Sequence, residues 1–403
     1  MNPRLCHVAK VNPATPEFDQ LSDDAQLPFL PLEAVWPSGR LDVSRRRSRA
    51  EGAVGYTRFR EGDILLPKIT PTFQADRSVI AQPIEGGVGV GTTELHTIRV
   101  SSNTDVRYVR YLLASKPFLD EGEASMLGVA GQQRVPEEFV RNVRVPVTEI
   151  GAQRRIANYL DAETARIDAL IEKKRRMMEL LGLRMHSARE ELVREARCSD
   201  KSERLGRVLR EIDDRLGEAA EPPPLLSVSI HRGVIPFAEA NPDRPPRADD
   251  LYSYKLCQAD DIVLNRMRAF QGGIGRAGVV GLVSPDYAVL RPARSASARY
   301  LDHLLRSPWF VGQMTQLVRG IGGVSQGNVR TPRVNWDDLR EVHVPLPSRD
   351  TQEQLTDSLD IGLKGAREAQ RMITQQINLL AERRQALITA AVTGELDISG
   401  VAA

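Results

Sequence analysis

The sequence predicts a mixed α/β protein with two globular domains, a pseudo-two-fold internal repeat and two long helices that pair as an antiparallel coiled coil. Three observations predict this fold class. The chain has 403 residues and 41% hydrophobic content, which suits two or three soluble domains. The same order of residues recurs about 200 positions later. Each copy ends in a long proline-free segment whose apolar residues follow a heptad spacing.

The repeat is clearest where an extended segment turns into a long helical segment. The first copy reads Val145-Pro146-Val147, then Gln153-Arg154-Arg155-Ile156-Ala157 and Leu160-Asp161; the second reads Val344-Pro345-Leu346-Pro347, then Gln352-Glu353-Gln354-Leu355 and Leu359-Asp360. The offset is 199 positions. Upstream, Gly62-Asp63-Ile64 matches Asp260-Asp261-Ile262 at an offset of 198, and Tyr108 matches Tyr300 at 192. A large, nearly constant offset indicates a duplicated module, and its drift indicates small insertions in surface loops.

Each copy therefore combines a globular part of about 150 residues, large enough to bury its own core, with one long helix. We expect domain boundaries as follows: a first globular domain at 1–149, a central helix at 150–197, a second globular domain at 198–349, a C-terminal helix at 350–394 and a tail at 395–403.

Within the first globular domain, the apolar runs at 63–69 and 95–100 predict buried strands, and 107–113 predicts a helix. Glycine clusters at 86–91, 272–275 and 320–323 predict turns. These clusters are not phosphate loops, because the chain contains no Gly-Lys dipeptide.

The two helical segments each carry one apolar seam with steps of three, four and seven residues. The seam positions are Leu160, Ile167, Ile171, Met178, Leu181, Met185 and Leu192 in the first segment, and Leu359, Leu363, Ala366, Ile373, Ile377, Leu380 and Leu387 in the second. Helices of these lengths span roughly 60–70 Å. One seam needs a partner, so we expect the helices to pack on each other. The alternative is that each helix packs back on its own domain.

Charge and cysteine content bound the function classes. The net charge is +2, so any DNA affinity must come from a local patch or from a partner. Arginine supplies 47 of the 55 cations, which suits phosphate and guanine contacts but is equally explained by codon bias. Three separated cysteines predict a reducing, cytoplasmic compartment, and no apolar run is long enough to span a membrane.

A catalytic constellation is not found. The chain has no amino-methyltransferase motif, since Asn241-Pro242-Asp243 lacks the aromatic residue that would follow. Pro285-Asp286 is not followed by the acid and lysine of a nuclease core, and the six histidines are scattered. We therefore expect a chain that is not an enzyme by itself and holds no metal.

The chain resembles the specificity subunit of type I restriction-modification systems over nearly its whole length. Besides the repeated segments above, the resemblance rests on Arg383-Arg384-Gln385-Ala386-Leu387-Ile388 through Thr393-Gly394-Glu395-Leu396-Asp397, and on Lys68-Ile69-Thr70-Pro71, Gly91-Thr92-Thr93-Glu94, Asn265-Arg266-Met267-Arg268 and Ser284-Pro285-Asp286-Tyr287. The first helical segment departs from the family pattern, because Ala152-Gln153-Arg154 lacks the glutamate found in the second.

The resemblance implies a division of labour. Each globular domain would be a target recognition domain for one half of a bipartite, asymmetric double-stranded DNA site. The helices would set the spacer and dock two methyltransferase subunits, which bind S-adenosylmethionine. Restriction subunits, which use ATP and Mg, would complete the complex, and this chain would bind no cofactor. The alternative is a non-catalytic coiled-coil scaffold that binds proteins without DNA specificity.

Base reading requires polar side chains on loops that reach a groove. The candidates lie beside glycine- or proline-marked turns; the alternative for each is an ordinary exposed polar residue. They are Lys68, Thr70, Thr92, Thr93, Gln132, Gln133 and Arg134 in the first domain, and Asn265, Arg266, Arg268, Gln271, Ser325, Gln326, Asn328 and Arg330 in the second.

Overall fold

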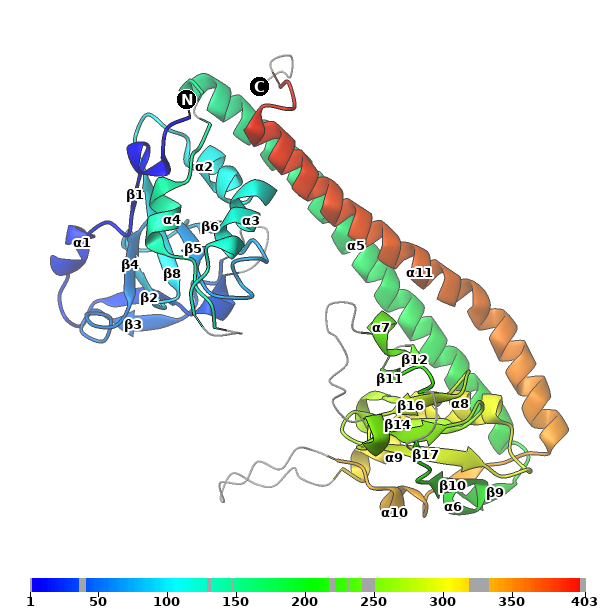
Figure 1. The fold of residues 1–403 in the computed structure, drawn as a ribbon. Helices are drawn as coiled ribbons and strands as arrows, with labels where there is room; N and C mark the ends of the chain where they lie inside the picture. The colour runs from blue at the N-terminus through cyan, green and yellow to red at the C-terminus, as the bar shows by residue number, and fades with distance from the viewer. Residues whose placement is uncertain are drawn as a thin grey trace. The chain divides into compact units, whose positions relative to one another are not determined.

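The computed structural model describes residues 2–35, 41–128, 132–146, 148–216, 222–230, 232–240, 251–318 and 333–398. The chain divides into two compact units. Unit 1 contains residues 1–174 and 374–403, and unit 2 contains residues 175–373. Both long helices cross this division (Figure 1), so each unit contains a globular part and a segment of each helix.

Unit 1 begins with a globular part built mainly from short strands. Its elements are η1 (Leu5–His7), β1 (Ala9–Val11), α1 (Pro16–Asp19), β2 (Gln26–Leu30), η2 (Leu32–Ala34), β3 (Arg46–Ser48), β4 (Thr57–Arg60), β5 (Ile64–Pro67), β6 (Val79–Ile80), β7 (Val88–Gly91), β8 (Leu95–Val100), α2 (Val106–Leu113), α3 (Lys116–Ala124) and α4 (Glu137–Asn142). The predicted strands and helix correspond to β5, β8 and α2. One sheet is antiparallel and has the order β1-β8-β5-β6. A second sheet is mixed, with the order β3-β2-β7-β4 and a parallel pairing between β2 and β7.

Unit 2 contains the corresponding elements of the second copy. They are β9 (Ser202–Arg204), α6 (Leu205–Val208), β10 (Leu209–Ile212), β11 (Leu226–Ser229), β12 (Gly233–Pro236), α7 (Phe237–Ala240), η4 (Leu251–Ser253), β13 (Lys255–Cys257), β14 (Ile262–Asn265), η5 (Ala269–Gln271), β15 (Ile274–Arg276), β16 (Gly281–Val283), β17 (Tyr287–Pro292), α8 (Ala298–Leu305), α9 (Pro308–Gln316), α10 (Trp336–Leu339) and β18 (His343–Pro345). Its main sheet has the order β10-β17-β14-β15, which reproduces the order in unit 1 strand for strand.

The main sheets of the two units contain the same buried ion pair at equivalent positions. Asp63 on the approach to β5 accepts two hydrogen bonds from Arg99 of β8, both at 2.8 Å. Asp261 before β14 accepts the same pair from Arg291 of β17, at 2.9 and 3.0 Å. Both carboxylates are almost fully buried. A charged group at such depth requires a partner, which explains why both members recur.

Tyrosine and glutamine contacts attach each globular part to its long helix. Tyr108 of α2 donates to the carbonyl of Pro146 at 2.8 Å, and Tyr300 of α8 donates to Pro345 at 2.8 Å. At the start of each long helix, a buried glutamine side chain accepts a hydrogen bond from the N-cap residue of α2 or α8. These glutamines are Gln153 and Gln352.

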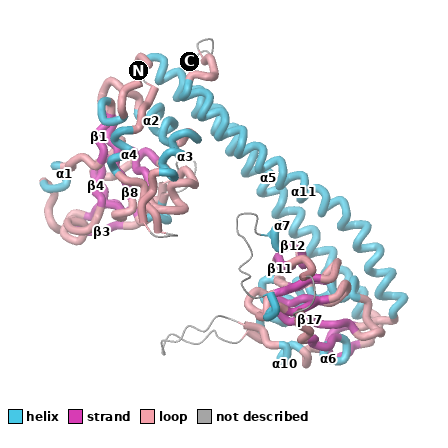
Figure 2. The backbone as a smooth tube through the Cα atoms, viewed as in Figure 1, coloured by secondary structure: helices cyan, strands magenta, loops and turns pink. Residues whose placement is uncertain are grey.

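The long helices α5 (Ile150–Arg197) and α11 (Arg349–Thr393) lie side by side (Figure 2). In unit 1, Asp168 pairs with Arg384 at 3.2 Å and Lys174 donates to Gln376 at 2.6 Å. Residue numbers therefore increase along α5 in the direction in which they decrease along α11. The helices are therefore antiparallel there. Helix α11 ends before Gly394, whose φ of 83° is the left-handed conformation common after a helix.

The fourteen seam positions are all buried or half-buried. In unit 1, Leu160 and Leu387 also contact the core of the globular part, whereas Ile167 and Ile171 are buried further along α5, next to α11. In unit 2, Met185 and Leu192 share one core with Leu359, Leu363 and Ala366. The two alternatives for the helices therefore coexist, because each helix packs on its partner helix and, near its ends, on a globular part. None of the helices among the described residues has the length and apolarity needed to cross a bilayer.

Candidate nucleic-acid interface

The seven candidates in unit 1 gather at one end of strand β5. We call Lys68, Thr70, Thr92, Thr93, Gln132, Gln133 and Arg134 loop cluster 1. Backbone hydrogen bonds tie its three segments together. Lys68 N donates to Glu94 O at 3.0 Å, Thr70 N donates to Gln133 O at 3.0 Å, and Val135 N donates to Lys68 O at 2.8 Å. Residues more than sixty positions apart in sequence thus form one surface.

Arg134 has a positioning role in this cluster. Its guanidinium makes two hydrogen bonds to Glu94, at 2.9 and 2.8 Å. These bonds hold the pKa of the Glu94 carboxyl below its ordinary value. The paired geometry fixes the 132–134 loop against the 92–94 loop. Glu94 was not among the predicted site residues, because sequence alone does not show that it faces Arg134.

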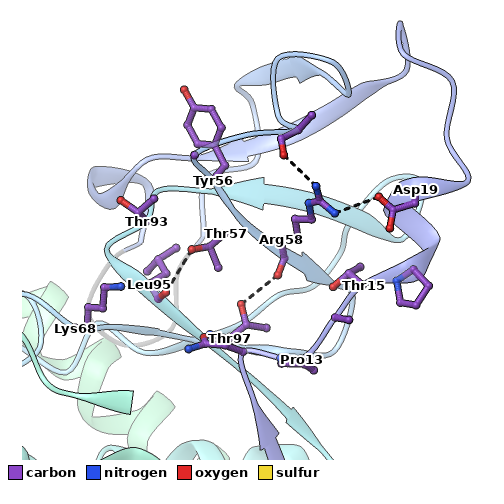
Figure 3. A pocket seen from close by; sticks show the side chains of 15 residues that line it. Pro13, Thr15, Asp19, Tyr56, Thr57, Arg58, Lys68, Thr93, Leu95 and Thr97 are labelled. Atoms are coloured by element: carbon purple, nitrogen blue, oxygen red, sulfur yellow. Dashed lines mark hydrogen bonds and ion pairs between the residues drawn. The ribbon is translucent and has the colours of Figure 1, made fainter. Parts of the chain in front are cut away.

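Lys68 keeps its ammonium group available. It makes no side-chain hydrogen bond or salt bridge with a described residue, and it lies half-buried at a cavity of about 520 Å³. Lys68 and Thr93 lie at one end of this cavity, and Arg58 and Asp19 lie at the other (Figure 3). Arg58 forms an ion pair with Asp19 at 3.1 Å. Among the described residues that line this cavity, Lys68 is therefore the cation that remains free to bind a ligand.

The remaining members of loop cluster 1 are polar and uncharged. Thr93 and Gln132 are exposed, whereas Thr70, Thr92 and Gln133 are half-buried. Thr92 Oγ1 accepts from the Glu94 amide at 3.3 Å, and Thr70 Oγ1 is buried without a hydrogen-bond partner among the described residues. The available groups are therefore hydroxyls, carboxamides and one ammonium, which match the acceptors and donors of base edges and phosphates.

Tyr56 is a surface residue at this site that sequence reasoning missed. It lines the cavity of Figure 3, and its ring meets Phe29 edge-on at 5.4 Å between centroids. Arg47 lies over both rings, at 4.5 and 5.1 Å. The neighbouring Val54 is 85% exposed. The available signal was an aromatic residue directly after Gly55, next to the segment that forms β4.

His96 is a structural residue. It is 4% exposed, and its Nε2 lies 3.0 Å from the carbonyl oxygen of Val135 while Nδ1 lies 3.1 Å from the Asn12 amide nitrogen. Burial lowers the pKa of His96, which favours the neutral ring. A neutral ring that donates to a carbonyl and accepts from an amide is fully used, so His96 supports the Lys68 loop rather than performing chemistry.

The described candidates in unit 2 follow β14, the strand equivalent to β5. We call Asn265, Arg266, Arg268 and Gln271 loop cluster 2. Asn265 is only 7% exposed, and its side chain holds the loop by donating to Tyr287 at 3.3 Å and accepting from the Met267 amide at 3.2 Å. It therefore has the position of a loop-fixing residue.

Arg266 and Arg268 differ in availability. Arg266 pairs with Glu211 at 2.5 Å, whereas Arg268 is exposed and makes no salt bridge with a described residue. Gln271 is exposed at the end of η5. Gly272 follows with φ 92°, a conformation that explains the glycine at this turn. The other four candidates, Ser325, Gln326, Asn328 and Arg330, lie outside the described residues.

Part of the chain is similar in sequence to two known proteins. No protein-family model matches the chain. It is 38% identical over 156 residues to the type I restriction enzyme EcoEI specificity subunit of Escherichia coli, and 37% identical over 158 residues to the EcoAI specificity subunit of the same organism. Each match covers 38% of this chain, but the chain spans only about a quarter of the length of each relative, at 25% and 26%.

The fold comparison covers much more of the molecule. A chain from a solved structure on complex assembly and conformational transition of the type I R-M system matches with a TM-score of 0.67 and 16% identity. The match covers 98% of both chains. In part of its sequence the chain is thus similar to specificity subunits of type I restriction enzymes, and over nearly its whole length it has the fold of a type I restriction-modification chain, as the sequence resemblance predicted.

Proposed function

We propose that the chain is the DNA sequence-specificity subunit of a type I restriction-modification complex. One observation carries this proposal: two copies of one scaffold present different polar loops at the same strand end. Loop cluster 1 follows β5 and loop cluster 2 follows β14, and these strands occupy the same place in sheets of the same order. Two different readers on one scaffold suit a target made of two unlike half-sites.

In this role the loops supply recognition. The free cations Lys68 and Arg268 would contact phosphate or guanine, and exposed residues such as Thr93, Gln132 and Gln271 would contact base edges. Arg134, Asn265 and Arg266 would fix loop shape, since their polar groups are occupied within the protein. The first globular domain would span 1–149 and the second 198–349, with helices 150–197 and 350–394 between and after them.

The partners would supply catalysis. Exposed apolar side chains on the helices support docking of two methyltransferase subunits: in unit 1, Leu170 and Leu379 are 46% and 63% exposed, and in unit 2, Ile361 is 78% exposed. The methyltransferase subunits would carry S-adenosylmethionine, and restriction subunits would use ATP and Mg. The complex would act in the cytoplasm, where its DNA target lies.

The test uses the complex of this chain with the methyltransferase subunit encoded beside it. We expect the complex to bind one bipartite duplex, with affinity that falls steeply as salt rises. Lys68→Ala and Arg268→Ala should each weaken binding by about 1–3 kcal/mol, and each should relax discrimination in a different half-site. Lys10→Ala and Arg294→Ala, which remove exposed cations from the same units outside the loop clusters, serve as controls. Equal affinity for all duplexes would contradict the role and favour the protein-binding scaffold.

The helices are proposed to act as the spacer. Inserting one helical turn into both α5 and α11 should change the number of base pairs between the half-sites and leave the half-site sequences unchanged. Methylome sequencing of cells carrying either form reads both quantities at once. A change in the half-sites at constant spacing would show that the helices do not set this distance.

A further inference from the structure

Two large apolar side chains are exposed among the described residues of the globular part of unit 1, and both adjoin loop cluster 1. Val54 is 85% exposed and Leu127 is 69% exposed. Leu127 exchanges two backbone hydrogen bonds with Arg134, at 3.0 and 2.9 Å. Val54 lines a hollow together with Thr92 and Thr93. Single exposed apolar residues are common on protein surfaces, but two beside one polar cluster indicate that this surface has an apolar component.

The hollow beside Val54 is largely apolar and has a volume of about 440 Å³. Its apolar and aromatic lining side chains are those of Phe29, Pro31, Leu32, Val54 and Tyr56. Among the described residues, the one charged side chain in its wall is Glu33, which pairs with Arg45 at 2.9 Å. This pair has no net charge, so the hollow offers no excess of positive charge to a phosphate and suits an uncharged group.

The loop that contains Val54 is fixed on both sides. Before it in the chain, the Ala53 carbonyl accepts a hydrogen bond from Arg58 at 3.0 Å, while the other terminal nitrogen of Arg58 pairs with Asp19 at 3.1 Å (Figure 3). After it, the Tyr56 ring packs edge-on against a second aromatic ring at 5.4 Å between centroids. A β-branched side chain on a loop held in this way loses little conformational entropy when it binds.

The hollow adjoins the cavity that contains Lys68. Gly55, Tyr56 and Thr93 line both of them (Figure 3). A cation that can bind phosphate and an apolar side chain that can contact a base edge therefore lie on one continuous surface. The apolar group that base edges present in the major groove is the 5-methyl group of thymine.

We propose that Val54 reads a thymine in the half-site of unit 1 by packing against its 5-methyl group. This inference rests on the proposed function, since it names one base contact of the DNA-specificity role. Cytosine and deoxyuridine lack this methyl group, so neither would make the contact. The hydroxyls of Thr92 and Thr93 beside the hollow are placed to contact polar groups of the same or the next base pair.

The test measures DNA binding by the complex of this chain with the methyltransferase subunit encoded beside it. The probes are duplexes of its bipartite site in which deoxyuridine replaces each thymine in turn, a change that removes only the methyl group. At one thymine of one half-site, we expect the replacement to weaken binding about fourfold, the effect of exposing roughly one methylene-sized group. In Val54→Ala, the thymine and deoxyuridine duplexes should bind with equal affinity.

Two control variants separate this contact from a general loss of apolar surface. Leu127→Ala removes a larger exposed side chain beside loop cluster 1, and Val279→Ala removes a valine of unit 2 that is 52% exposed. Both variants should keep the difference between the thymine and deoxyuridine duplexes. Because Val54 is itself exposed, Val54→Ala should fold like the unmodified chain.

Three results would overturn the assignment of Val54 while leaving the proposed function intact, because the complex would still bind one bipartite sequence. The first is tolerance of deoxyuridine at every thymine. The second is a thymine preference that persists in Val54→Ala. The third is weaker assembly of Val54→Ala with the methyltransferase subunit at an unchanged thymine preference, which would assign Val54 to a protein interface. Equal affinity for all duplexes would instead contradict the proposed function and this inference together.

Discussion

Units 1 and 2 agree in the contacts that hold their scaffolds and differ in the groups that they present. The Tyr108 and Tyr300 hydrogen bonds have the same length of 2.8 Å, although the two residues are 192 positions apart. By contrast, the residue that follows the equivalent strand is Lys68 in one unit, with a free ammonium, and Arg266 in the other, paired with Glu211. Duplication preserved the buried polar network, and the loops diverged because the core does not constrain them.

The junction between helix and globular part shows the same division. Asp161 and Asp360 occupy equivalent positions and each binds an arginine from the neighbouring helix, Arg107 at 2.8 Å and Arg299 at 2.9 Å. Seven residues further along, which is about two helical turns, unit 1 has Asp168 where unit 2 has Arg367. The shared aspartate–arginine contact and the position with opposite charge thus lie on the same helical face. The first is common to both units, whereas the second differs between them.

The largest effect should come from removing the repeated buried carboxylates. Asp63→Ala should destabilise unit 1 by roughly 3–5 kcal/mol, because Arg99, only 13% exposed, would lose its partner in a buried site. Asp261→Ala should cost less, about 2 kcal/mol, because Arg291 is 36% exposed and water can solvate it. Hydrogen exchange of β5 and β14 amides reads each unit separately.

Asp286→Ala is the matched control, since Asp286 pairs with Arg333 at the surface and its loss should change stability by less than about 0.5 kcal/mol. Equal losses in Asp63→Ala and Asp261→Ala would show that burial of the arginine does not decide the cost. If only one of the two variants lost stability, the two ion pairs would not be equivalent despite their matching geometry.

Much of this comparison could be predicted from the sequence, because it depends on spacing. The offset of 199 positions located the starts of both long helices, and the heptad steps selected positions that are buried or half-buried in the structure. The run at 95–100 coincides with β8. The hydrophobic periodicity and the repeated polar residues are visible in the sequence itself, so these features of the fold can be predicted from it.

The division into units and the use of each polar side chain could not be predicted in this way. The sequence suggested that the helices were separate elements, whereas each helix contributes part of its length to each unit. Arg134 and Lys68 are both cations beside turns, yet Glu94 occupies the first and leaves the second free. Such differences depend on contacts between segments far apart in sequence, which a single sequence does not report.

A smaller effect, equal in both units, should follow from Tyr108→Phe and Tyr300→Phe. Each change removes one hydrogen bond to a proline carbonyl and should cost about 1 kcal/mol. Burial raises the pKa of Tyr108 to about 12, so the neutral phenol is favoured in the folded chain. Its contribution is fully present below the unfolded pKa of about 10 and is lost as pH rises towards 12.

Urea unfolding at neutral and alkaline pH measures both quantities. The Tyr108→Phe chain should lose less stability than the wild type between about pH 10 and pH 12, since it no longer carries the titrating group. If the free energies of unfolding of the two variants differed by more than about 1 kcal/mol at neutral pH, the two tyrosine contacts would contribute unequally to the stability of the two units.

The smallest effect concerns thiol reactivity and leaves stability unchanged. Cys6 in unit 1 and Cys198 in unit 2 are exposed, whereas Cys257 on β13 is fully buried. Burial raises the pKa of the Cys257 thiol to about 11, so little thiolate exists at pH 8. Iodoacetamide should modify the first two cysteines of the native chain and leave the third unmodified, as mass spectrometry of tryptic peptides would show.

Cys257 becomes reactive only when its strand opens, so its labelling rate reports the opening of unit 2 alone. Asp261→Ala should accelerate that labelling, whereas Asp63→Ala should leave it unchanged. Acceleration by Asp63→Ala would mean that the two units do not open independently.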